Sequence, residues 1–148
     1  MTRLLALLLV ACVLSGCSDD QDAYCGALAD AQKKLDALAD DIAKKGAEDP
    51  VGPTLAVLED LRAKAPEELQ DEWDTVVFAW QDLDDLVDSL GVSPADLGKG
   101  AEAPDGVSPR DLRQLRATAA ELQSPRVLDA ARGIEDHARE VCKVEFDT

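Results

Sequence analysis

The sequence predicts an all-α protein, an antiparallel helical bundle of about four main helices plus one or two short helices. Apolar residues recur three or four positions apart along nearly the whole chain, and no segment alternates apolar and polar residues as a strand would. Serine–proline pairs and Gly- or Pro-containing turns divide this repeat into segments. A length of 148 residues is typical of one domain.

Residues 1–16 have the composition of a secretory signal peptide. Arg3 precedes an apolar run over 4–14, which is shorter than the roughly 20 residues that a membrane-spanning helix needs. The run ends in Leu14-Ser15-Gly16-Cys17, which resembles the bacterial lipobox. We therefore expect removal of residues 1–16 and attachment of a lipid to Cys17. The alternative is an ordinary secreted protein, cut nearby, with Cys17 as a free or paired thiol.

A diacylglycerol on Cys17 would anchor the exported chain on the outer face of the cytoplasmic membrane, because each buried CH₂ contributes about 0.8 kcal/mol. Residues 17–22 then form a lipidated tether, and residues 23–148 form a single helical domain. An extended chain spans about 3.3–3.6 Å per residue, so residues 18–22 reach less than ~20 Å. The domain should therefore lie close to the bilayer.

Three apolar stripes predict the first helices. The first helix follows the tether, is capped by an aspartate at 19, 20 or 22, and ends near Lys45. A shorter helix over 53–65 is broken or sharply bent at Pro66, and the most regular stripe ends at Gly91. The stripes are Tyr24, Leu28, Ala31, Leu35, Leu38 and Ile42, then Leu55, Leu58, Leu61 and Ala65, then Leu69, Trp73, Val76, Trp80, Leu83, Val87 and Leu90.

Three serine–proline pairs predict the later helix starts. Ser93-Pro94, Ser108-Pro109 and Ser124-Pro125 each place a capping hydroxyl before a proline in the first helical position. The first pair predicts a short helix that ends at Gly98, followed by a connecting loop over 98–106. The two later helices should bury Leu112, Leu115, Ala119 and Leu122, and Val127, Ala131, Ile134, Ala138 and Val141.

Cysteine usage predicts one disulfide. Cys12 leaves with the signal peptide and Cys17 takes the lipid, so Cys25 and Cys142 are the pair that remains in an oxidising compartment. Cys25 lies in the first turns of the first helix and Cys142 in the last turn of the final one. Because antiparallel neighbours bring those ends together, the disulfide should join the first helix to the last, beside the anchor.

The charge disfavours nucleic acid as a partner, since a net charge of −16 leaves no basic footprint for phosphates. Most of the acidic excess lies before residue 107. Arg110, Arg113 and Arg116 recur on one predicted helix. They form either a strip for an anionic partner or, in the interpretation we favour here, side chains that pair with the acidic helices of the same domain or are solvated.

Few residues are candidates for catalysis, metal binding or ligand binding. His137 is the only histidine and has no nucleophile motif around it, so we expect a structural or surface role. The aspartates between 82 and 88 sit in a helical stripe rather than in a calcium loop, which indicates a solvated acidic face. We expect no catalytic residue, metal or cofactor. Trp73 and Trp80 either line a pocket for an apolar ligand or, as we favour, pack in the core.

The overall layout resembles small helical lipoproteins of actinobacteria. The resemblance rests on the lipobox, Tyr24-Cys25, the break at residues 63–69, Ser124-Pro125-Arg126-Val127 and the closing Val141-Cys142. It implies an envelope protein outside the cytoplasmic membrane and carries no catalytic residue over. We expect a non-enzymatic interaction or structural module, whose partner would be another exported protein. The alternative is a carrier of a small apolar or cationic ligand in the bundle core.

Overall fold

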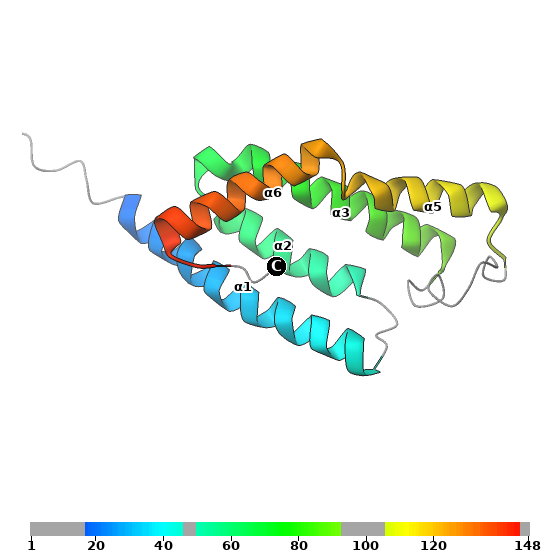
Figure 1. Ribbon diagram of the computed structural model, residues 1–148, viewed down its shortest axis with the longest axis horizontal. Helices are drawn as coiled ribbons and strands as arrows, with labels where there is room; N and C mark the ends of the chain where they lie inside the picture. Colours follow the sequence, from blue (N-terminus) through cyan, green and yellow to red (C-terminus); the bar gives the residue numbers. More distant parts are fainter. Residues whose placement is uncertain (1–16, 46–49, 93–105, 146–148) are drawn as a thin grey trace, which may run out of the picture.

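The computed structural model describes residues 17–45, 50–92 and 106–145, and these residues form helices joined by short connections, without a strand. Successive arms of the bundle run in alternating directions, with α5 and α6 as the two halves of the fourth arm (Figure 1). This confirms the predicted antiparallel bundle. The elements are α1 (Cys17–Lys45), α2 (Val51–Lys64), η1 (Glu67–Leu69), α3 (Gln70–Leu90), α5 (Pro109–Glu121), α6 (Pro125–His137) and the π-helical turn η2 (Ala138–Cys142).

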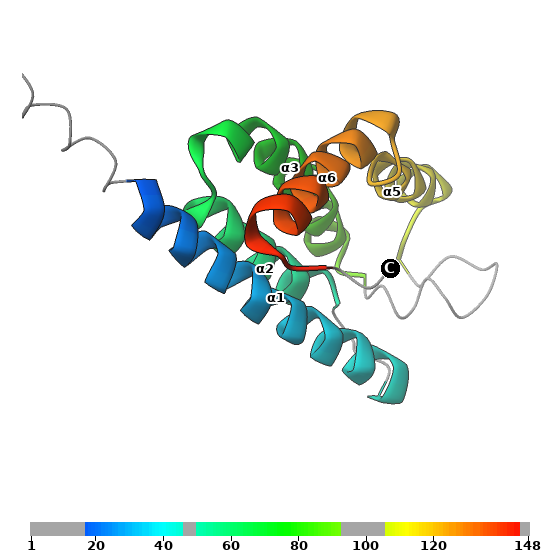
Figure 2. The same cartoon turned by 60° about the vertical axis from the view of Figure 1, so that its left-hand side comes forward.

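The helix α2 occupies the middle of the packing order, between α1 and α3 (Figures 1 and 2). Gln81 of α3 donates a hydrogen bond to Glu59 of α2 at 2.7 Å, and Arg62 of α2 pairs with Asp74 of α3 at 2.5 Å. On its other side, α3 packs against α6 and α5. The short second helix, whose packing the sequence left open, is therefore a central member of the bundle.

Two connections end helices as the sequence predicts. Ala65 and Pro66 are extended, with ψ of 141° and 157°, so α2 stops before the proline ring would clash with the preceding turn. The Gln70 side chain donates to the freed Ala65 carbonyl at 2.7 Å. Gly91 ends α3 in the left-handed region at φ 60°, a conformation that costs glycine little because it has no Cβ.

Serine caps start α5 and α6. The Ser108 hydroxyl accepts a hydrogen bond from the Asp111 backbone N–H at 3.2 Å, and the Asp111 carboxylate accepts one from the Ser108 N–H, which completes a capping box. Ser124 caps α6 in the same way through the Val127 N–H at 3.3 Å. Both predicted starts are confirmed, whereas the one at Ser93-Pro94 lies outside the described residues.

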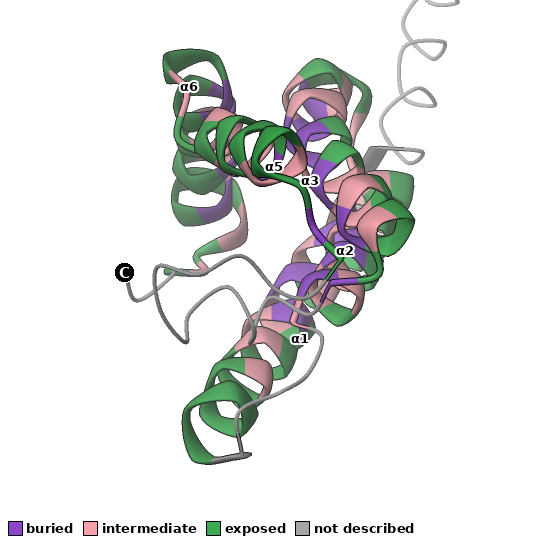
Figure 3. Ribbon diagram, turned by 90° about the vertical axis from the view of Figure 1, so that its right-hand side faces the viewer, coloured by how far each residue is buried: buried purple, intermediate pink, exposed green. Residues whose placement is uncertain are grey.

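Buried residues lie on the sides of the helices that face one another (Figure 3). They form two apolar clusters that meet at Trp80 and Leu122. The larger cluster joins α1, α2, the first half of α3 and α6, and the smaller one joins the second half of α3 to α5 and to the first residue of α2. The buried residues of the larger cluster are Tyr24, Leu28, Ala31, Leu55, Leu61, Leu69, Trp73, Val76, Val77, Ala79, Val127, Ala130, Ile134 and Ala138. Those of the smaller cluster are Val51, Leu83, Val87, Val92, Val107 and Leu115.

The start of α1 differs from the prediction. Residues 17–22, expected as a tether before the first helix, are the first turns of α1, and no aspartate at 19, 20 or 22 starts the helix. Because a helix rises about 1.5 Å per residue, Cys25 lies only about 12 Å along the axis from Cys17. The proposed anchor and the disulfide are thus joined by a continuous helix.

Two apolar stripes are buried less far than predicted. On α1 the burial fades after Ala31, since Leu35 and Leu38 are half-buried and Ile42 is 39% exposed. At the C-terminal end Val141 is 49% exposed, although the stripe placed it inside. The π-turn η2 adds a residue to the turn and shifts the helical phase, so that Cys142 rather than Val141 faces the core.

Candidate functional site

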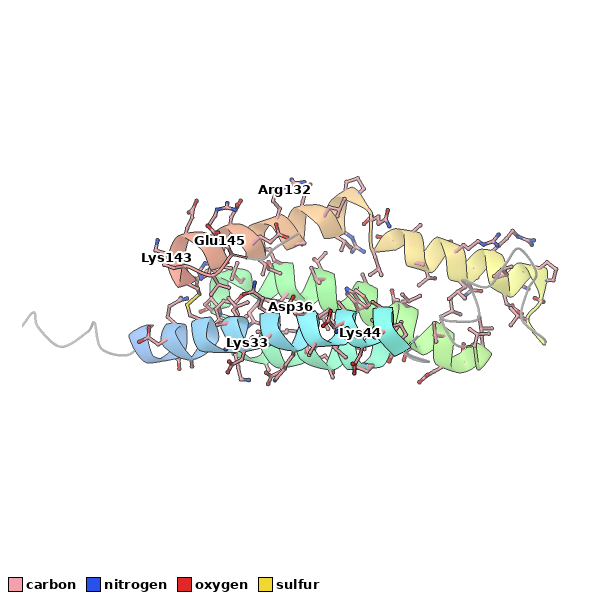
Figure 4. All side chains as sticks on the ribbon, turned by 60° about the horizontal axis from the view of Figure 1, so that its bottom comes forward. Lys33, Asp36, Lys44, Arg132, Lys143 and Glu145 are labelled. Atoms are coloured by element: carbon pink, nitrogen blue, oxygen red, sulfur yellow. A yellow bond between two sulfur atoms is a disulfide. The ribbon has the colours of Figure 1, made fainter. Side chains whose placement is uncertain are left out.

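The start of α1 and the end of the fourth arm meet at one end of the bundle, where a disulfide joins Cys25 to Cys142 (Figure 4). The two Cα atoms are 5.0 Å apart although the residues are separated by 117 positions in the sequence. The disulfide between the first and last helical regions is confirmed. Cys142 lies in η2 rather than in α6 itself.

After the disulfide the chain turns back along α1. Lys143 adopts a left-handed conformation with φ 57°, and the Val144 N–H donates to the Ala138 carbonyl at 3.0 Å. The Gln32 side chain of α1 then donates to the Glu145 carbonyl at 2.8 Å. The C-terminal segment is therefore attached to α1 by the Gln32 side chain as well as by the disulfide.

Gln21 connects the two helices around the sulfur atoms. Its amide Nε2 lies 3.3 Å from Cys25 Sγ, 3.7 Å from Cys142 Sγ and 3.2 Å from His137 Nε2. An amide N–H can only donate, so His137 Nε2 is the acceptor in this contact. Gln21 was not among the predicted site residues, because a side chain in the expected tether would have no fixed neighbours.

Tyr24 and Trp73 form the polar contact at the centre of this end. Tyr24 is fully buried and Trp73 is 3% exposed, and the indole Nε1 donates to the Tyr24 hydroxyl at 2.9 Å. Burial raises the pKa of the Tyr24 hydroxyl above its usual value, and the Trp73 hydrogen bond offsets only part of that rise. The rings of Tyr24 and His137 contact each other edge to face, with 6.0 Å between their centroids.

These contacts together form a clasp, which we define as Gln21, Tyr24, Trp73, His137 and the disulfide. The two sulfur atoms are bonded to each other, and His137 contacts an amide and an aromatic ring. Such partners hold helices together and do not activate a nucleophile. Within the described ranges, no group of three His, Cys, Asp or Glu side chains is arranged to hold a metal ion.

The two tryptophans lie in the core, as the favoured interpretation predicts. Trp73 is buried and hydrogen-bonded, and Trp80 is half-buried and packs against both apolar clusters. A depression of about 530 Å³ lies elsewhere, between α2 and α3. It is lined by Gly52, Leu55, Ala56, Glu59, Gln81, Asp84 and Asp85, so its wall is acidic and contains neither indole.

The remaining sequence-predicted residues lie on the surface or at the start of α1. Cys17 is the first residue of α1. Arg110, Arg113 and Arg116 are all exposed on α5, and no ion pair joins them to any residue that the structure describes. Their exposure agrees with solvation, which is one of the two roles in the favoured interpretation.

Comparisons of the chain with models of protein families, with characterised proteins and with solved structures found no match. None of the described helices is both long enough and apolar enough to cross a membrane. The functional interpretation therefore depends on the residues of this chain alone.

Proposed function

We propose that this chain is an exported lipoprotein, anchored through a lipid on Cys17 to the outer face of the cytoplasmic membrane. The observation that carries the proposal is the Cys25–Cys142 disulfide. Disulfides persist in compartments outside the cytoplasm, and this one uses both cysteines that the predicted mature chain has besides Cys17. Cys17 then remains at the end of the lipobox sequence.

The geometry of α1 supports the same proposal. Cys17 begins α1, and the clasp starts one helical turn later at Gln21. A lipid at this position would therefore hold the closed end of the bundle at the bilayer and direct α5 and the second half of α3 away from it (Figure 1). The bundle would act as a non-enzymatic interaction or structural module of the cell envelope.

Palmitate labelling in a bacterial host tests the anchor. The wild-type chain should incorporate the label and sediment with membranes, whereas Cys17→Ala should lose both properties. Cys12→Ala is the matched control, because it changes the other cysteine of the N-terminal segment and should leave labelling intact. Label that persists in Cys17→Ala would refute the anchor site.

The carrier of a small apolar or cationic ligand in the bundle core remains the alternative, and the described core gives it less support. Trp73 and Trp80 contact apolar neighbours in the clusters, and the depression between α2 and α3 is open to solvent and acidic. A carrier of this kind should bind an apolar fluorescent dye in the core, with quenching of tryptophan fluorescence. Unchanged fluorescence at saturating dye would count against it.

A further inference from the structure

The helix α5 has an outer surface that differs from every other described helix surface in this acidic protein. Its exposed residues include three arginines and no carboxylate. The two carboxylates of α5 are occupied at its ends, since Asp111 belongs to the capping box and Glu121 pairs with Arg126 at 3.1 Å. The exposed residues are Pro109, Arg110, Arg113, Gln114, Arg116, Ala117 and Ala120. We name Arg110, Arg113 and Arg116 the arginine face.

The other arginines of the described chain behave differently. Each of them forms an ion pair with a carboxylate: Arg62 with Asp74, Arg126 with Glu121, Arg132 with Asp129 and Arg139 with Asp136. In a chain with 31 acidic residues, three exposed arginines on one helix lack such a partner within the described residues. A guanidinium has a planar set of donors that matches a carboxylate, so this face is suited to carboxylates from outside the molecule.

A complementary surface exists on α3. Asp82, Asp85 and Asp88 are exposed and are spaced three residues apart, as the three arginines are. No described residue forms an ion pair with them. We name them the aspartate row. Residues three apart on a helix are surface neighbours with Cβ atoms about 5–6 Å apart, so the arginine face and the aspartate row have the same charge spacing.

We propose that the arginine face of one copy docks on the aspartate row of a second copy of this chain. At physiological ionic strength the Debye length is about 8 Å, so the net charge of −16 is screened between separated surfaces, while contacting charges are screened less. The electrostatic repulsion between two acidic copies is weakest at a surface without carboxylates. A second copy is therefore steered toward α5.

The position of the two surfaces fits lateral association on a membrane, a step that rests on the proposed function. The second half of α3 packs against α5 through Leu83, Val87 and Leu115, so both surfaces lie at the end of the bundle away from Cys17 (Figure 1). Copies anchored in one membrane would hold the arginine face and the aspartate row at the same distance from the bilayer. Because two different surfaces meet, the contact is heterologous and can extend to further copies.

A charge exchange tests the contact in solution, independently of lipidation. The first variant combines Arg110→Glu, Arg113→Glu and Arg116→Glu, and the second combines Asp82→Lys, Asp85→Lys and Asp88→Lys. Each should associate about tenfold or more weakly than wild type in sedimentation at high protein concentration, because like charges now face each other. An equimolar mixture should recover the association, since the new glutamates face the new lysines. Circular dichroism should show unchanged helix content, as all six positions are exposed.

A matched control uses Arg132→Glu combined with Arg139→Glu, which changes exposed arginines of α6 and η2 outside the arginine face and should leave association unchanged. The proposal is overturned if the wild-type chain stays monomeric, if either triple variant associates as the wild type does, or if the mixture fails to recover. If the wild-type chain takes up no palmitate label but the mixture of triple variants recovers association, the lipid anchor is refuted and the contact between copies is supported.

Discussion

Trp73 of α3 donates its indole N–H to the hydroxyl of Tyr24 of α1, with 2.9 Å between the two atoms. The bond joins the two helices that flank α2. Each side chain brings one polar atom into the larger apolar cluster, and each satisfies the other. The pair therefore fixes the register of α1 on α3, because either atom left alone would be buried without a partner.

Tyr24→Phe should destabilise the fold by about 1–3 kcal/mol, because it leaves the buried Trp73 N–H without an acceptor. Urea unfolding followed by tryptophan fluorescence measures the change. A double-mutant cycle with Trp73→Phe serves as the control. The double variant should cost less than the sum of the two single variants, since the second substitution removes the orphaned donor. Additive costs would show that the hydrogen bond contributes nothing.

Alkaline pH should destabilise the protein through the same residue. Burial raises the pKa of Tyr24 above 10.0, so the unfolded chain loses this proton at a lower pH than the folded one. The stabilisation is complete below about pH 10 and is lost as the pH rises through the folded-state value. Tyr24 is the only tyrosine, so phenolate absorbance reports it alone. A phenolate transition near the ordinary pKa in the folded protein would contradict the prediction.

The sequence predicts the elements well because their signals are local. The serine hydroxyls before Pro109 and Pro125, the extended backbone at Pro66 and the left-handed Gly91 act within one turn of the chain, and each is where the sequence places it. The disulfide was predictable because only one pair of cysteines was left and antiparallel order brings their ends together. Local chemistry and simple topology suffice for these features.

The features that escaped prediction depend on tertiary contacts. Tyr24 was counted as an apolar position, although a tyrosine and a tryptophan in one predicted core already signal two polar atoms that need a partner. Gln21 acquires its contacts only because α1 continues back to Cys17. The limit of burial on α1 is likewise set by where the neighbouring helices end, which periodicity within α1 does not encode.

Two leucines of α1 test where the core stops. Leu28→Ala should cost about 2–5 kcal/mol, because Leu28 is fully buried in the larger cluster and its removal leaves a cavity. Leu38→Ala makes the same chemical change ten residues later, at a half-buried position, and should cost about 1 kcal/mol or less. Chemical denaturation of both variants gives the comparison. Equal costs would mean that the stripe is packed along its full length.

Reduction of the disulfide should destabilise the whole chain and release its C-terminal end first. The bond closes a loop over 117 positions, for which the chain-entropy model gives about 4–5 kcal/mol. The turn η2 makes few contacts with α1, whereas α6 packs extensively on α3. Amides of 138–142 should therefore exchange with solvent much faster after reduction, while those in the middle of α3 stay protected.

The double variant Cys25→Ser and Cys142→Ser should behave like the reduced protein and be insensitive to reductant. If reduction leaves both the unfolding midpoint and the exchange of 138–142 unchanged, the clasp is held by Gln21, His137 and the Tyr24–Trp73 pair without a contribution from the disulfide.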